Sequence, residues 1–207
     1  MRHTIVVFLS IIIGIEACLV ILGWGFGVEQ LTRITPIGIN MKFPTAVTFL
    51  ATAVGLYYIS RTAKENHDVS QIILPGIALF IFAYMSALFA SAALGVTTGL
   101  DSPFTIEGRS VFTAGAGMPA LPTMINFVLF GFASIVSLFP GTKQRRATVF
   151  FGSCIFILGL IGALGYILHI PALYYQFSGP FVPIAFNTAI LFVLLGAGLI
   201  VIGKEKK

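Results

Sequence analysis

The chain has 207 residues, of which 57% are hydrophobic and 9% are charged. Soluble domains are about 25% charged, and a chain of this size cannot bury so much apolar surface in one core, so an ordinary soluble protein is excluded. The formal net charge is +5, but the basic residues sit in short segments beside apolar runs, which argues against nucleic-acid binding. We therefore expect an integral membrane protein whose main partner is the lipid bilayer.

Six apolar runs are long enough to cross a membrane, since a transmembrane helix needs about 20 mostly apolar residues. They cover approximately residues 4–26, 43–60, 71–96, 118–139, 147–168 and 182–202. The sequence thus predicts an all-α fold in which residues 1–207 form a single domain of six transmembrane helices.

Short basic links follow the second and fourth runs, at residues 61–68 and 141–146. Together with Arg2 and the C-terminal lysines, they hold nine of the twelve Lys and Arg residues. The positive-inside rule therefore predicts that both termini lie in the cytoplasm, which an even number of spans also requires. The expected protein is a multi-pass protein of the cell (plasma or inner) membrane, built from three helical hairpins.

A four-part pattern opens the second, fourth and sixth runs. It consists of Pro or Asn, then Thr, then Phe four residues after the Thr, then a small residue four positions further on. The copies are Pro44, Thr45, Phe49 and Ala53; Pro122, Thr123, Phe127 and Gly131; and Asn187, Thr188, Phe192 and Gly196. Steps of four keep residues near one helix face, and Pro, Asn and Thr suit a helix start. The pattern predicts three degenerate hairpins whose returning helices begin with the same chemistry.

Glu16 is an acidic residue well inside an apolar run. A carboxylate is costly in hydrocarbon, so we expect it to face the bundle or to be protonated. Its functional interpretations are a proton-coupled site, a ligand contact or an anchor in a complex. Its structural interpretation is a hydrogen bond to a neighbouring helix, for example to the hydroxyl of Thr48, Thr52 or Tyr84.

The outer ends of the helices supply the other candidate contacts. Asn126 and Asn187 suit helix caps or interhelical hydrogen bonds, and three converging helix N-termini could hold an anionic or polar group. Aromatic residues before the last run suit an interfacial belt or a pocket. The candidate ligand-binding residues are Glu16, Thr45, Thr123, Asn126, Asn187, Thr188, Tyr174 and Tyr175, and the candidate cytoplasmic partner contacts are Arg61, Lys64, Lys143, Arg145 and Arg146.

No residue arrangement typical of an enzyme or a metal site stands out. His3 and His67 are expected on the cytoplasmic side and His169 on the other, without Cys or carboxylates at ligand spacing. No Ser-His-Asp, paired-carboxylate or Cys-His arrangement is evident either. We therefore predict no catalytic residues, no metal and no cofactor.

Residues 41–50 (MKFPTAVTFL) and 186–192 (FNTAILF) resemble a known helix start. It is the Met-x-Pro-Asn-Thr-Ala-Leu-x-Phe-Leu pattern in the N-terminal multi-span sensor regions of prokaryotic histidine kinases and diguanylate cyclases. Residues 170–175 (IPALYY) are similar to the outer link before the last span there. In this chain Pro replaces Asn in the first two copies, and Met124 replaces Ala in the second. The resemblance implies a sensory or signal-coupling region, here without a PAS, kinase or cyclase module after it.

We therefore expect a non-enzymatic membrane module that passes a stimulus from its outer links or its bundle to a cytoplasmic signalling protein. The alternative is an accessory or structural subunit of a membrane complex. A small proton-coupled transporter using Glu16 is less favoured, because transporters place several polar groups near the bilayer midplane. A homo-oligomer is compatible with each of these functions.

Overall fold

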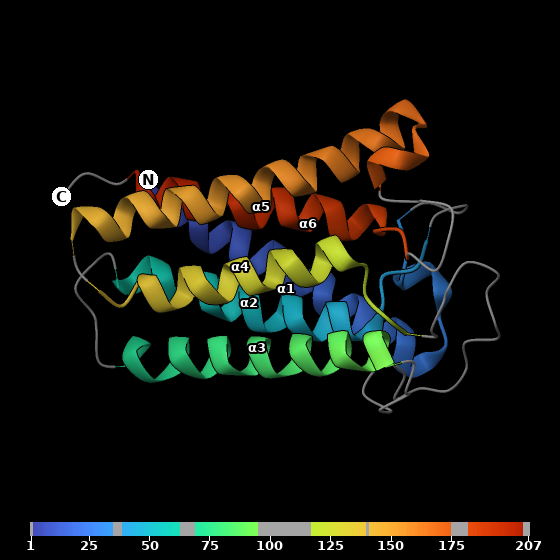
Figure 1. The fold of residues 1–207 in the computed structure, drawn as a ribbon, viewed down its shortest axis with the longest axis horizontal. Helices are drawn as coiled ribbons and strands as arrows, with labels where there is room; N and C mark the ends of the chain where they lie inside the picture. Colours follow the sequence, from blue (N-terminus) through green and yellow to red (C-terminus); the bar gives the residue numbers. More distant parts are fainter. Residues whose placement is uncertain are drawn as a thin grey trace.

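The computed structural model describes residues 2–34, 39–62, 69–94, 117–139, 141–174 and 182–204. These residues form six α-helices, antiparallel to their chain neighbours, in an elongated bundle (Figure 1). The helices are α1 (Arg2–Phe26), α2 (Phe43–Thr62), α3 (Ser70–Leu94), α4 (Leu121–Val136), α5 (Thr142–Leu168) and α6 (Phe186–Gly203), with the 3-10 helices η1 (Glu29–Leu31) and η2 (Pro171–Tyr174). No strand occurs in these ranges, so the predicted all-α fold is confirmed.

Five of the helices, α1, α2, α3, α5 and α6, are long and apolar enough to cross a membrane. The composition-based prediction of a membrane protein therefore agrees with the structure. Helix α4 has 16 residues, and at about 1.5 Å per residue it is shorter than the hydrocarbon core of about 30 Å. Helix α5 begins at Thr142, earlier than the expected residue 147, so most of the predicted basic link is its first turn.

The helices pack as three hairpins. The most extensive contacts join α5 with α6, α1 with α2, and α3 with α4. Further contacts of α2 with α3, α4 with α5, and α1 with α6 close the hairpins into a ring. The first and last described residues, Arg2 and Lys204, lie at one end of the bundle, here called the proximal end, and η1 and η2 lie at the opposite, distal end (Figure 1).

The returning helix of each hairpin lies inside, and the outgoing helix lies outside. Within their most apolar windows, α2 and α6 are 61% and 56% buried, whereas α1, α3 and α5 are 28%, 28% and 33% buried. Helix α2 also contacts both α4 and α6. The outer helices expose large apolar side chains such as Phe8, Ile72 and Phe150, as expected of surfaces that face lipid.

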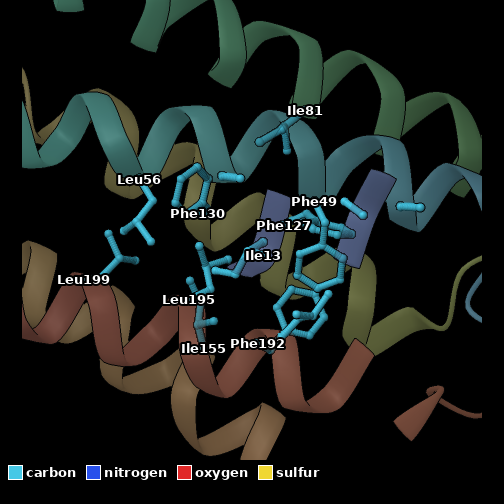
Figure 2. Packing of buried hydrophobic residues seen from close by; sticks show 14 of the residues in the cluster. Ile13, Phe49, Leu56, Ile81, Phe127, Phe130, Ile155, Phe192, Leu195 and Leu199 are labelled. Carbon is cyan, nitrogen blue, oxygen red and sulfur yellow. The ribbon is translucent and has the colours of Figure 1, made fainter. Parts of the chain in front are cut away.

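The inner helices meet at the Phe residue of each repeat copy. The ring centroid of Phe49 lies 4.9 Å from that of Phe127 and 4.8 Å from that of Phe192, and the Phe127 and Phe192 centroids are 5.0 Å apart. All three side chains are fully buried, and Figure 2 shows the rings lying against one another. Their edge-on and tilted geometries are the arrangements that aromatic pairs prefer. The repeat therefore places one ring per hairpin at the centre; we call these residues the phenylalanine triad.

The small residue of each copy faces the other helix of its own hairpin. A Cβ atom on Gly14 of α1 would lie 3.6 Å from the Cβ atom of Ala53. A Cβ on Gly131 would lie 2.8 Å from the Phe82 ring of α3, and one on Gly196 would lie 2.6 Å from a carbonyl oxygen of α5. Small residues let helices approach closely in lipid, where no hydrophobic force draws them together. The repeat copies thus determine both the aromatic centre of the bundle and the pairing of the two helices within each hairpin.

We expect Gly196→Ala to destabilise the bundle. The new methyl group would meet the backbone of α5, which cannot move without shifting the helix, so we expect a loss of about 1–3 kcal/mol in the free energy of unfolding. The matched control is Gly76→Ala in α3, where a Cβ atom has open space and helix propensity favours Ala by up to about 1 kcal/mol. Unfolding in detergent measures both variants, and equal losses would contradict the tight α5–α6 contact.

Candidate functional site

A polar contact joins α1, α6 and the segment after α1 in the distal half of the bundle. The Asn187 Nδ2 atom donates to Glu16 Oε1 at 3.4 Å and to the Thr32 carbonyl oxygen at 3.3 Å. The Asn187 Oδ1 atom accepts from the backbone N–H of Thr188 at 3.1 Å. Asn187 is only 1% exposed. We call Glu16, Thr32 and Asn187 the distal polar contact. It brings together residues from both ends of the sequence.

The segment between α1 and α2 is fixed to the bundle around Thr32. The Thr32 carbonyl oxygen also accepts from the Met41 N–H at 2.8 Å, and the Trp24 indole Nε1 donates to the Met41 carbonyl oxygen at 2.9 Å. Thr32 and Met41 are both buried. A single carbonyl oxygen therefore links this segment to the first turn of α6, and sequence reasoning missed both Thr32 and Trp24.

The hydrogen-bond partner of Glu16 differs from the two threonine hydroxyls suggested by the sequence. The Thr48 and Thr52 hydroxyls donate to carbonyl oxygens of their own helix, at 2.8 Å and 2.9 Å. The carboxylate of half-buried Glu16 accepts from the Asn187 amide of α6 instead. Polar side chains inside a membrane pair with one another in this way, because unpaired polar groups are costly in hydrocarbon.

The threonines of the three copies lie in the first turns of the inner helices. Thr45, Thr123 and Thr188 are each 2% exposed, and the phenylalanine triad one turn further on holds these helices together. The N-cap residues of α4 and α6 are Ala120 and Ala185, and neither makes a side-chain capping hydrogen bond. The expected Asn or Thr cap is therefore absent from these two helix starts.

Asn126 differs from Asn187 in its surroundings. Its side chain is 0% exposed, and neither its Nδ2 nor its Oδ1 atom has a hydrogen-bond partner in the described part of the chain. An unpaired buried amide costs about 1–3 kcal/mol. Because of this cost, apolar packing alone does not explain why an asparagine occupies position 126.

The aromatic candidates lie against the distal ends of α5 and α6. The rings of Tyr174 and Tyr166 stack with centroids 4.4 Å apart, and the Tyr166 hydroxyl donates to the Ile184 carbonyl oxygen at 2.7 Å. Phe186 lies edge-on to Tyr166 at 5.4 Å. Tyr174 is therefore part of an intramolecular cluster centred on Tyr166, a residue that sequence reasoning missed, whereas Tyr175 lies outside the described residues.

The candidate partner contacts lie at the proximal end. Arg61 is in the last turn of α2, and its guanidinium lies 5.9 Å from the centroid of the Tyr57 ring. Lys143, Arg145 and Arg146 belong to the first turns of α5. Lys64 falls outside the described residues. The same end holds the Arg2 guanidinium, whose Nη1 atom donates to the Lys204 carbonyl oxygen at 2.7 Å.

No group of three His, Cys, Asp or Glu residues within the described ranges is placed to hold a metal ion. No protein-family model, curated protein or solved structure matches the chain.

We expect the two buried asparagines to respond oppositely to substitution by Leu. Asn187→Leu leaves Glu16 and the Thr32 carbonyl oxygen without this donor, so we expect a loss of about 1–3 kcal/mol in the free energy of unfolding. Asn126→Leu removes an unpaired amide and should leave this free energy unchanged or raise it. Unfolding of both variants in the same detergent gives the comparison, and a larger loss for Asn126→Leu would show that its amide is paired.

Proposed function

We propose that the chain is a six-span protein of the cell membrane with both termini in the cytoplasm. The distribution of basic residues supports this topology, because Arg2, Arg61, Lys204 and the first turns of α5 share the proximal end. The position of α4 supports its assignment as the sixth span. It packs between α3 and α5, and its chain connections leave from opposite ends of the bundle (Figure 1).

We further propose that this protein is a non-enzymatic signal-coupling module. The observation that carries the proposal is that α6 is hydrogen-bonded to α1 near both of its own ends. Asn187 joins them at the distal polar contact, and Arg2 joins the start of α1 to the end of α6 at the proximal end. Thr32 connects the same asparagine to the segment between α1 and α2, here called the distal segment. A displacement of that segment would thus move α6 relative to α1 and change the basic proximal surface.

The partner that receives this change is proposed to be a cytoplasmic signalling protein. Basic side chains at the proximal end offer charge complementarity to an acidic surface. The resemblance to multi-span sensor regions points to the same role. The stimulus would act near the distal starts of the inner helices, where Thr45, Thr123 and Thr188 lie.

The alternatives receive less support. A structural subunit would be expected to offer small-residue faces to its partners, but Gly152 and Gly159 of α5 already pack against α6. A proton-coupled transporter would depend on Glu16, and the hydrogen bond from Asn187 gives that carboxylate a structural role. Neither alternative explains why the distal segment is tied to both the first and the last helix.

The test is photo-crosslinking in native membranes from a probe amino acid at Arg61. We expect an adduct with a cytoplasmic signalling protein whose yield changes several-fold in Asn187→Leu, because that variant breaks the distal polar contact. Gly76→Ala, which meets no neighbouring atom, is the control and should leave the yield unchanged. A yield that Asn187→Leu does not alter would contradict signal coupling, and a stoichiometric membrane partner would favour the subunit function.

A further inference from the structure

Three helix ends form a corner at the proximal end of the bundle. The Arg2 Nη1 atom at the start of α1 donates to the Lys204 carbonyl oxygen just after α6. A Cβ atom on Gly203 would lie 2.9 Å from the carbonyl oxygen of Arg145, which places the start of α5 against the end of α6. Two further cations, Lys143 and Arg146, belong to the same turns of α5. We call these five basic residues the basic corner.

The basic corner carries positive charge without nearby negative charge in the described part of the chain. The carboxylates described there are those of Glu16 and Glu29. Glu29 pairs with Arg33 at the distal end, and Glu16 belongs to the distal polar contact. Helices α1 and α5 begin at this corner and add partial positive charge, whereas α6 ends there and adds partial negative charge next to Arg2 and Lys204. Cations in the first turn of α5 therefore repel its dipole, and a bound anion would relieve that repulsion.

Exposed apolar side chains lie near the basic corner on both α1 and α5. On α1, Ile5 and Phe8 are 47% and 61% exposed, and on α5, Phe150 is 61% exposed. Each of these residues lies within two helical turns of a corner cation, or about 11 Å along the helix axis. A ligand that fits both features has an anionic head and apolar chains. Arginine suits such a head, because its planar guanidinium can bond two phosphate oxygens at once.

We propose that the basic corner binds the headgroup phosphate of one anionic phospholipid, whose acyl chains lie against α1 and α5. Arg145 and Arg146 supply the main phosphate contacts, and Arg2 and Lys204 supply further positive charge. This binding site does not depend on the signal-coupling function proposed above. Arg61, in the last turn of α2 at the same end of the bundle, is not one of the five residues of the basic corner.

The test uses the full chain in nanodiscs of phosphatidylcholine with a minority of phosphatidylglycerol, followed by native mass spectrometry of the retained lipid. We expect one retained phosphatidylglycerol. Arg145→Gln should reduce its retention about fivefold, as the loss of one cation near a membrane surface predicts. Arg61→Gln is the matched control and should leave retention unchanged, and Arg145→Lys should retain more lipid than Arg145→Gln because it keeps the charge. Should Arg145→Gln fail to fold, Arg146→Gln replaces it, since that side chain is exposed.

Three results would overturn the proposal. Equal losses in Arg145→Gln and Arg61→Gln would show diffuse attraction in place of a site. Equal retention of phosphatidylcholine would show that the phosphate charge is not recognised. Displacement of the lipid by millimolar glycerol phosphate would show that the corner binds a soluble phosphate compound and does not need the acyl chains.

Discussion

The mutual contact of Phe49, Phe127 and Phe192 is the interaction on which the rest of the bundle depends. Each ring comes from a different hairpin, and all three are buried with centroids about 5 Å apart. In lipid, helices are held together by packing and hydrogen bonds, since the surrounding chains are as apolar as the side chains. A triad of interlocking rings gives that packing a defined centre, and the small residue one turn further on fixes each outer helix to its inner partner.

Two polar contacts complete this packing where the chain closes on itself. Helices α1 and α6 are neighbours in the ring although they are the first and last in the sequence. Asn187 and Glu16 join them in the distal half, and Arg2 and Lys204 join them at the proximal end. Because Asn187 also donates to the Thr32 carbonyl oxygen, the distal segment between α1 and α2 cannot move independently of α1 and α6. The proposed transmission of a stimulus follows from this connection.

The sequence predicted the helices and their hairpin order well, because apolar run length and the Pro/Asn-Thr-x-x-x-Phe pattern are local signals. It could not predict that the three Phe residues touch, since that contact depends on how hairpins far apart in the chain pack together. The pairing of Glu16 with Asn187 was missed for the same reason: 171 positions separate them, and a hydroxyl on the next helix is an equally reasonable partner. Helix α4 proved shorter than its apolar run, because Ala120 is extended and the chain turns after Val136.

The most direct test of the phenylalanine triad is a set of double-mutant cycles of Phe→Leu substitutions, with the free energy of unfolding measured in one detergent or bilayer system. The account predicts that all three pairs among Phe49, Phe127 and Phe192 couple by about 0.5–1.5 kcal/mol. The control pair, Phe89 on α3 and Phe150 on α5, is exposed and should be additive. Additive behaviour of the three central pairs would contradict a bundle centred on the repeated phenylalanine.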